Sequence, residues 1–307
     1  MMIEVTRECN MRCTYCRVDK GGGHMSWRTF KKTADLARWL GHRSFAFTGG
    51  EPLMNPDLLE MIDVLAHKFR NPSFSLTTNG MLLSSGFLER IQDYRFLVAL
   101  SHDGTSQTLN RPMARGDSIR VADAAARLLL EYRPESIVMY TLTPDTVRNL
   151  MKDVEHLSAL GFKRIRINPD YYRTDWDPQS LSVSICDVLD RFKDIEFLGL
   201  EKGYRPGGCG DELFVSVDGM LYPCAIHKDE GLCIGNVETG VNECALERIM
   251  SASSSIPVRC IGCEIGNECG MSCACNRLIT THSLCDVSGS FCSVEKALAD
   301  VRRRCSV

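Results

Sequence analysis

Short apolar runs alternate with longer amphipathic stretches over the first half of the chain. The runs are rich in β-branched and aromatic residues, which favours strands at 3–5, 44–48, 73–77, 96–100, 136–142 and 164–168. Strands that alternate with helices form a parallel sheet with right-handed crossovers, so the pattern predicts an α/β fold. Because six units are fewer than the eight of a closed TIM barrel, we expect an incomplete barrel, open on one side.

Two of the amphipathic stretches carry end signals. Asn55 followed by Pro56 predicts an N-cap and a first-turn proline for a helix whose apolar face runs from Leu58 to Phe69. Pro144 is expected to open the next-to-last helix, where apolar residues recur at helical spacing up to residue 160, and Gly161 is expected to end it.

Five of the six predicted strands are followed by a polar segment. These segments read CNMRCTYC, TGGEP, TTNG, SHDG and NPD, after the first, second, third, fourth and sixth strands. The carboxyl ends of parallel strands meet at one rim of the sheet, which is where the active sites of α/β enzymes lie. We therefore expect the five segments to form one site.

The sixteen cysteines are unevenly placed along the 307 residues. Three lie between residues 9 and 16, the next is Cys186, and twelve lie between Cys209 and Cys305. A secreted disulfide scaffold is usually small and has a signal peptide, whereas the N-terminal residues here contain no such apolar run. Because thiols stay reduced in the cytoplasm, the cysteines predict a cytoplasmic metalloprotein with a cysteine-rich tail.

The overall charge balance argues against two classes of partner. The net charge is only −3, so no basic field favours nucleic acid or an anionic membrane surface. No stretch approaches the roughly 20 apolar residues that cross a bilayer. We therefore expect neither a nucleic-acid nor a membrane partner.

Cys9, Cys13 and Cys16 place three thiolates on one short loop. A structural zinc site usually needs four ligands, and only His24 is near enough in sequence to be the fourth. A 4Fe–4S cluster held by three thiolates keeps one iron open for another ligand. The missing fourth ligand favours the cluster over zinc.

This CxxxCxxC segment, with Tyr15 just before its last cysteine, resembles the signature of radical S-adenosylmethionine (SAM) enzymes. The GGEP segment is similar to that family's second motif, and the resemblance covers roughly residues 1–170. It implies that the open iron binds the amino and carboxylate groups of SAM. Gly49 and Gly50 would let the backbone approach the methionine end, and Glu51 would receive the ammonium group.

Further SAM contacts are implied for residues of the predicted rim: Tyr15, Asn79, Ser101, Asp103, Arg115 and Asn168. Tyr15 and Asn168 would meet the adenine, and Arg115 is preferred over Arg111 as the partner of the SAM carboxylate. The resemblance also implies the reaction: the reduced cluster gives one electron to the sulfonium, and a 5′-deoxyadenosyl radical takes a hydrogen atom from substrate. A flavodoxin- or ferredoxin-type protein would donate the electron.

The tail opens with a hairpin signal, because LFVSV and MLYPC flank the turn residues Asp218 and Gly219. The four cysteines between residues 260 and 273 could form a zinc knuckle, but a knuckle leaves three others unexplained. The whole string resembles, spacing for spacing, the SPASM extension of radical SAM enzymes. Its seven cysteines are Cys209, Cys224, Cys260, Cys263, Cys269, Cys273 and Cys292.

The SPASM resemblance implies two auxiliary 4Fe–4S clusters, and therefore three clusters in the protein. Cys209, Cys224 and Cys273 would hold the first, and Cys260, Cys263, Cys269 and Cys292 the second. The first auxiliary cluster would then keep one open iron, or it would take a fourth ligand from Cys186, Cys233 or Cys244. The cysteines that ligate no cluster are expected to be free thiols; they are Cys275, Cys285 and Cys305 and those of Cys186, Cys233 and Cys244 that are not used. The expected architecture is a partial (β/α)6 radical SAM barrel over residues 1–200 and a SPASM domain over 201–307.

The substrate is the least determined property. The SPASM resemblance implies an oxidoreductase that oxidises or cross-links a peptide or protein. The alternative is an enzyme that dehydrogenates or rearranges a small molecule such as an amino-sugar or cyclitol. An electron-transfer protein without SAM chemistry is disfavoured, because it would not need the GGEP motif. Sulfatase maturases have an aspartate after the second cysteine of the extension, where this chain has Ala225.

The chain begins close to its first strand, so we expect no N-terminal leader-binding domain. No catalytic base is assigned, although Asp218, Asp229 and the segment 170–177 offer acids and aromatic residues.

Overall fold

The predicted strands form one parallel sheet. The structure, a computed structural model, describes residues 1–114, 116–200, 213–224, 230–266, 268–269 and 273–305. All six predicted strands are present, each within one residue of the expected bounds: β1 (Met2–Thr6), β2 (Ser44–Gly49), β3 (Ser73–Thr78), β4 (Phe96–Ser101), β5 (Ile137–Leu142) and β6 (Arg164–Pro169). Together with β7 (Glu196–Leu198) they pair in parallel in sequence order, which confirms the α/β expectation.

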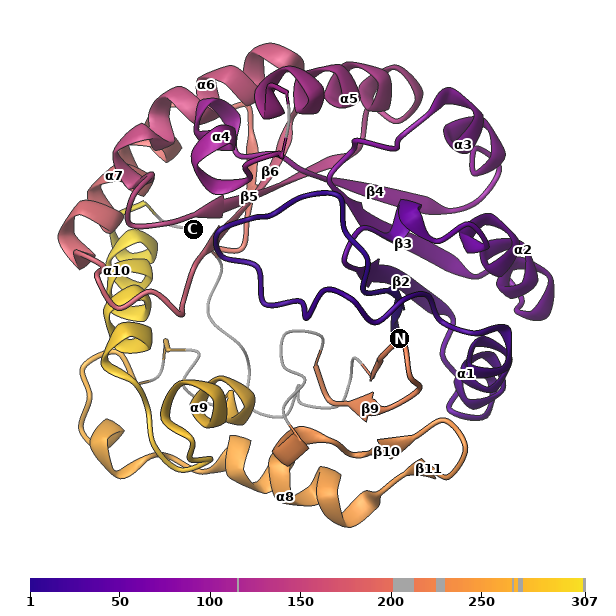
Figure 1. Cartoon of the computed structure of the whole chain (residues 1–307). Coiled ribbons are helices and arrows are strands. Elements are labelled where there is room, and N and C mark those ends of the chain that lie inside the picture. The colour runs from indigo at the N-terminus through magenta and orange to yellow at the C-terminus, as the bar shows by residue number, and fades with distance from the viewer. Residues whose placement is uncertain (115, 201–212, 225–229, 267, 270–272, 306–307) are drawn as a thin grey trace.

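Helices cover the outer face of this sheet in a single arc (Figure 1). They are α1 (Trp27–Trp39), α2 (Leu58–Lys68), α3 (Ser85–Arg90), α5 (Ser118–Tyr132), α6 (Leu150–Leu160) and α7 (Pro178–Arg191), with the short α4 (Gln107–Asn110) at the rim. Alternate strand residues such as Ile3, Phe45, Leu76 and Val98 are buried against them. The barrel helices leave the arc open, which agrees with the incomplete barrel expected from six strand–helix units.

The tail fills the opening between the two ends of the arc (Figure 1). The predicted hairpin is present: β8 (Phe214–Val215) pairs antiparallel with β9 (Leu221–Tyr222) around Gly219, whose φ is 85°. β8 also pairs in parallel with β1, so the hairpin extends the barrel sheet to nine strands. The expected domain boundary at residue 200 lies at the edge of residues 201–212, outside the described residues.

The rest of the tail is mostly helical. It comprises a two-stranded ribbon of β10 (Gly235–Asn236) and β11 (Gly240–Val241), then α8 (Glu243–Ser254), α9 (Ala274–Thr281) and α10 (Gly289–Cys305). Helix α10 packs along α7 of the barrel. No helix among the described residues is long and apolar enough to cross a membrane.

Two predicted helix starts are wrong, and one predicted end is confirmed. Helix α2 begins at Leu58, after a turn at residues 56–57: Asn55 Oδ1 accepts from the N–H of Asp57 (2.9 Å), while its Nδ2 donates to the carbonyl of Val5 (2.8 Å). Helix α6 begins at Leu150 after a 3₁₀ turn (Val147–Asn149), since Thr143 and Thr146 first form a tight turn. Gly161 ends α6 with a φ of 112°, as expected.

Candidate active site at the carboxyl rim of the barrel

The first three cysteines lie on a loop that leaves the carboxyl end of β1. Cys9, Cys13 and Cys16 are half-buried, and Thr14 N–H anchors the loop by donating to the carbonyl of Asn110 (2.9 Å). Burial raises the pKa of Cys9 and of Cys13, and the charge of Cys16 raises both further. The three thiols therefore lie close together in a setting that disfavours uncompensated thiolates.

His24, the one residue considered as a fourth ligand, has other partners. Its Nδ1 lies 2.9 Å from the hydroxyl of Thr6, and its Nε2 lies 3.8 Å from the carboxylate of Glu8. Both ring nitrogens thus face oxygen atoms of the β1 end. This arrangement leaves three thiols as the donor set of the loop.

The glycines of the second motif bring two loops into direct backbone contact. A Cβ at Gly49 would lie 2.0 Å from the carbonyl oxygen of Thr6, and one at Gly50 would lie 2.1 Å from that of Glu8. The N–H groups of Gly50 and Glu51 donate to those same two oxygens, at 2.9 and 2.7 Å. The glycines are therefore required for packing against the cysteine loop, a reason that the sequence alone did not indicate.

Glu51 ties three loops of the rim together. It is 1% exposed, and its carboxylate accepts from the Thr78 hydroxyl (2.7 Å), Asn79 N–H (2.7 Å) and Leu53 N–H (3.2 Å). Burial raises the pKa of Glu51, against the opposing effect of these donors. The Asn79 side chain in turn donates to Asn10 Oδ1 of the cysteine loop (2.7 Å). Since a carboxylate offers about four acceptor sites, three used sites leave one for an ammonium group.

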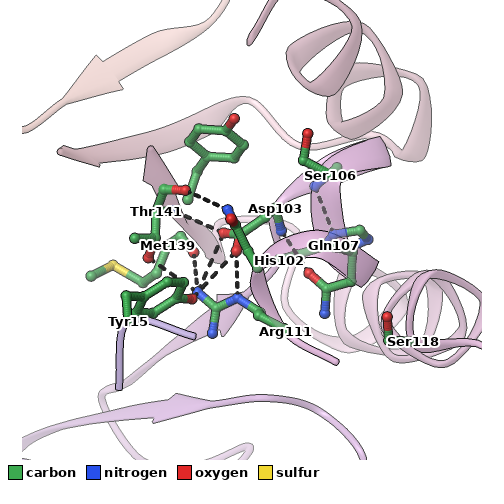
Figure 2. Close-up of polar contacts among 12 residues, drawn as sticks. Tyr15, His102, Asp103, Ser106, Gln107, Arg111, Ser118, Met139 and Thr141 are labelled. Carbon is green, nitrogen blue, oxygen red and sulfur yellow. Dashed lines mark hydrogen bonds and ion pairs between the residues drawn. The ribbon is translucent and has the colours of Figure 1, made fainter. Parts of the chain in front are cut away.

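A buried ion pair supports the neighbouring part of the rim, after β4 (Figure 2). Arg111 Nε lies 2.8 Å from Asp103 Oδ2, and the two side chains are 7% and 0% exposed. Asp103 also accepts from Thr141 N–H (2.8 Å) and from the hydroxyl of Tyr15 (3.3 Å), whose ring centre lies 5.2 Å from the guanidinium. Arg111 thus binds a carboxylate of the protein itself, while Arg115 lies outside the described residues.

The remaining predicted rim residues lie on neighbouring strands. Ser101 is buried at the end of β4. Asn168, half-buried on β6, is in register with Thr141 on β5, and its Nδ2 donates to the carbonyl of Tyr140 (3.4 Å). Tyr15, Asp103, Thr141 and Asn168 therefore follow one another around one part of the rim, whereas Glu51 and Asn79 lie together at another.

Sequence reasoning missed a polar network directly behind Asp103. Asp123 Oδ1 lies 2.9 Å from Nε2 of His102 and 2.7 Å from Nε2 of His156. His102 Nδ1 accepts the N–H of Gly104 (3.1 Å), so the proton of the neutral ring is on Nε2. A metal at Nε2 would need the other tautomer, whose Nδ1–H would oppose that N–H. We conclude that these three residues form a hydrogen-bonded network that fixes the SHDG loop.

Comparisons with known proteins decide the family. A family model described as the Radical SAM superfamily matches residues 3–157, about half of the chain. The chain belongs to the radical SAM superfamily.

The relatives agree with the SPASM-type recognition. The cysteine-type anaerobic sulfatase-maturating enzyme of Clostridium perfringens is 26% identical over 276 residues, 75% of either chain. The subtilosin biosynthesis protein AlbA of Bacillus subtilis is 24% identical over 254 residues, 76% of this chain and 56% of that protein. The native enzyme anSMEcpe with bound AdoMet has the same fold: the TM-score is 0.84 over 99% of this chain and 96% of that one, at 21% identity. The radical SAM fold and recognition are thereby confirmed.

The thiols of this radical SAM enzyme's tail lie in two described groups. Cys260, Cys263 and Cys292 influence one another: burial raises the pKa of Cys260, and the charges of Cys292 and Cys263 add to it. Cys224 and Cys273 both act on Tyr172, which follows β6. Cys209, expected beside them, lies outside the described residues.

The cysteines suggested as lenders of a fourth ligand have definite surroundings. Cys186 on α7 lies 2.7 Å, sulfur to sulfur, from Cys305 at the end of α10. The Cys233 thiol donates to the carbonyl of Gly235 (3.4 Å), and Cys244 is exposed on the first turn of α8. Cys186 and Cys233 therefore each have a contact partner within the protein, Cys305 and Gly235 respectively.

The described donor sets fit iron–sulfur clusters. Burial and neighbouring thiols raise the pKa of Cys13 and of Cys260, so a cationic centre would be needed to hold these side chains as thiolates. After its three hydrogen bonds, the Glu51 carboxylate has one acceptor site left, which could accept from the ammonium group of SAM. The residues of this chain are therefore compatible with both cofactors of the family.

Proposed function

We propose that this radical SAM enzyme is an oxidoreductase that abstracts hydrogen from a peptide or protein and oxidises or cross-links it. One observation carries the proposal: the sequence similarity to the sulfatase-maturating enzyme extends over three quarters of both chains, beyond the barrel. AlbA, the second relative, is named for the biosynthesis of a bacteriocin. Solved anSMEcpe also exists with a bound peptide, Cp18Cys.

In this proposal Cys9, Cys13 and Cys16 would hold the cluster that binds SAM. Bound together, that cluster and SAM supply a 5′-deoxyadenosyl radical after one-electron reduction by a flavodoxin- or ferredoxin-type donor. Glu51 holds the ammonium group, with Gly49, Gly50 and Asn79 fixing its loop. The chain itself contributes orientation and exclusion of water.

The other rim residues would orient the nucleoside. Tyr15 and Asn168 lie at the adenine, and Ser101 at the ribose or carboxylate. The Asp103–Arg111 pair holds Tyr15 through the phenol hydroxyl and the face of the ring. Arg115 is kept as the proposed partner of the SAM carboxylate.

The tail would hold two auxiliary 4Fe–4S clusters, which gives three in all. Cys209, Cys224 and Cys273 ligate the first; Cys260, Cys263, Cys269 and Cys292 ligate the second. They would accept the electron that substrate oxidation releases. Asp218 is a poor candidate for the accompanying base, because Arg7 (3.1 Å) and the Ser216 hydroxyl both bind its carboxylate; Asp229 lies outside the described residues.

Anaerobic reconstitution with iron and sulfide tests the cofactor assignment. We expect about twelve irons, four for each cluster. The triple variant Cys9→Ala, Cys13→Ala, Cys16→Ala should lose about a third of that iron and all reductive cleavage of SAM. Tightly bound zinc, or unchanged iron in the variant, would contradict the assignment.

The substrate class is tested by counting 5′-deoxyadenosine against product. Reduced enzyme and SAM are incubated with short cysteine- or serine-containing peptides and, in parallel, with amino-sugars and cyclitols. We expect a peptide to increase 5′-deoxyadenosine formation and to lose two hydrogen atoms, either by oxidation of one residue or by formation of a cross-link. Turnover of the small molecules alone would overturn the peptide proposal.

A further inference from the structure

Helix α10 returns from the tail to the barrel, where it packs along α7 (Figure 1). Its buried face continues to the last turn, where Val301 and Arg302 are both buried. The Arg302 guanidinium donates to the carbonyls of Leu200 (3.5 Å), which follows the barrel sheet, and Glu268 (3.0 Å), which belongs to the tail. The last turn of α10 therefore connects the two regions of the molecule.

A pair of thiols lies between the two helices at this turn. Cys186 is on the buried face of α7, and its sulfur lies 2.7 Å from that of Cys305, the last residue of α10. Cys305 follows Val301 by four residues and therefore shares the buried face of α10. The two cysteines are 119 positions apart in sequence, and neither belongs to the ligand sets assigned to the three clusters. The tertiary fold alone brings these thiols together.

The two thiols differ in their access to solvent. Cys186 is 5% exposed, whereas Cys305 is half-buried, so a dissolved oxidant meets Cys305 first. Burial raises the pKa of Cys186 to about 12, and the hydrogen bond and charge of Cys305 add to this shift. Once Cys305 has reacted, its thiol no longer opposes ionisation of Cys186, which then lies beside the reacted sulfur.

We propose that Cys186 and Cys305 form a disulfide that fixes the last turn of α10 on α7 when the protein meets a low-molecular-weight disulfide. The Cys305 thiolate attacks one sulfur of that oxidant and releases one thiol, which leaves a mixed disulfide. The Cys186 thiolate then attacks the Cys305 sulfur and releases the second thiol. The protein loses two hydrogen atoms, and the oxidant gains them as two reduced thiols.

The consequence of this bond is local and covalent. Because the sulfurs already lie 2.7 Å apart, bond formation needs only a small adjustment of the two side chains. The bond holds the last turn of α10 against local opening, since the turn can no longer leave the barrel. A disulfide sulfur is not a thiolate, so oxidation also withdraws Cys186 from the cysteines that could ligate a cluster.

The test is oxidation of the holoenzyme, reconstituted under reducing anaerobic conditions, with glutathione disulfide. Free thiols are then blocked with N-ethylmaleimide as the protein is denatured, and unreduced peptides are identified by mass spectrometry. We expect the peptides of Cys186 and Cys305 to be joined, and Cys244, exposed on the first turn of α8, to carry glutathione. Glutathione on Cys244 together with maleimide on both Cys186 and Cys305 would overturn the proposed disulfide.

Two variants and an unfolded sample show whether the fold selects this pair. In Cys186→Ser we expect Cys305 to retain glutathione, because no second thiol displaces it, whereas Cys244→Ser is the matched control and should leave the linked peptide unchanged. In protein unfolded by urea the yield of the link should fall about tenfold, since sixteen thiols then compete. Equal yields in folded and unfolded protein would refute selection of the pair by the fold.

Hydrogen exchange measures the effect on α10. Amides of the last turn, residues 301–305, should exchange about tenfold more slowly in the oxidised than in the reduced wild type. Cys305→Ser should show no such difference after the same treatment. Equal exchange in the two redox states of the wild type, with the linked peptide present, would show that the bond does not fix this turn.

Discussion

The barrel rim and the tail build their sites in different ways. At the rim, the side chains beside the cysteine loop are fixed by the sheet: Glu51 and Asp103 are buried, Glu51 accepts from Thr78 and Asn79 at the end of β3, and Asp103 accepts from Arg111 and from Thr141 on β5. In the tail, the described strands β8 to β11 have two residues each, and Cys224, Cys263 and Cys273 lie in loops or at a helix end. The buried polar side chains of the rim are therefore held by contacts within the protein, whereas we infer that folding of the tail depends on bound metal.

Removal of iron should make this difference between the rim and the tail most visible. Because metal binding contributes directly to the folding of small metal-bound units, anaerobic chelation is expected to unfold the tail around Cys263 and α9 while β2 to β6 stay folded. Hydrogen exchange read by mass spectrometry distinguishes the two regions: the tail peptides should exchange within the dead time and the barrel peptides should keep their protection. Equal protection of α9 with and without iron would show that the tail is organised like the rim.

The buried ion pair of the rim offers the next largest effect. Arg111→Met leaves Asp103 buried without its cation, which should lower the free energy of unfolding by about 3–5 kcal/mol. Arg164→Met is the matched control, because its ion pair with Glu196 is solvent-exposed and worth at most about 1 kcal/mol. Urea titrations of both variants give the two values. Similar losses in the two variants would mean that Asp103 is not held by Arg111.

The two residues of the second motif should separate SAM binding from loop packing. Glu51→Gln removes the charge that would bind the ammonium group, so we expect SAM affinity to fall by about 1.5–3 kcal/mol with all iron retained. Gly50→Ala places a Cβ against the carbonyl of Glu8 and should reduce both SAM affinity and the iron of the N-terminal cluster.

Gly86→Ala is the control for the glycine variant, since a Cβ there meets nothing within 4 Å. Equilibrium dialysis with labelled SAM and an iron assay report the two properties independently. Loss of iron in Glu51→Gln would show that the carboxylate serves the cysteine loop rather than SAM.

The difference between rim and tail also explains what the sequence could predict. The strand bounds follow from local runs such as Ser73–Thr78, in which apolar and polar residues alternate and every second residue is buried. The pairing of β8 with β1 could not be predicted, since Phe214 pairs with Met2 on the open edge of the sheet, 212 residues away in sequence. The GGEP motif was recognised, but the contact that requires its glycines, with the carbonyls of Thr6 and Glu8, is visible only in three dimensions.

Residues that act through others were the hardest to predict. Arg111 and Arg115 are four residues apart, and nothing local distinguishes the one that pairs with Asp103. The network behind Asp103 draws on β4, α5 and α6, and each member alone looks like an ordinary polar residue of its element. The sequence thus predicts which loops meet, whereas the tertiary contacts decide what each polar side chain binds.

That network gives the smallest expected effect, a change in the pH dependence of stability. Burial would raise the pKa of Asp123, but the hydrogen bonds from His102 and His156 outweigh it, so the pKa lies below its ordinary value. A carboxyl with a lowered folded-state pKa stabilises the protein above its unfolded-state pKa, and this contribution is lost as the pH falls through the folded-state value. Asp123→Asn should therefore be less stable than the wild type near pH 7, by about 1–3 kcal/mol for hydrogen bonds to a charged group. The difference should shrink below about pH 4, the range in which an ordinary Asp protonates. Urea midpoints measured across that range test this, and a difference that stays constant down to acid pH would assign the loss to packing of the SHDG loop and not to the charge of Asp123.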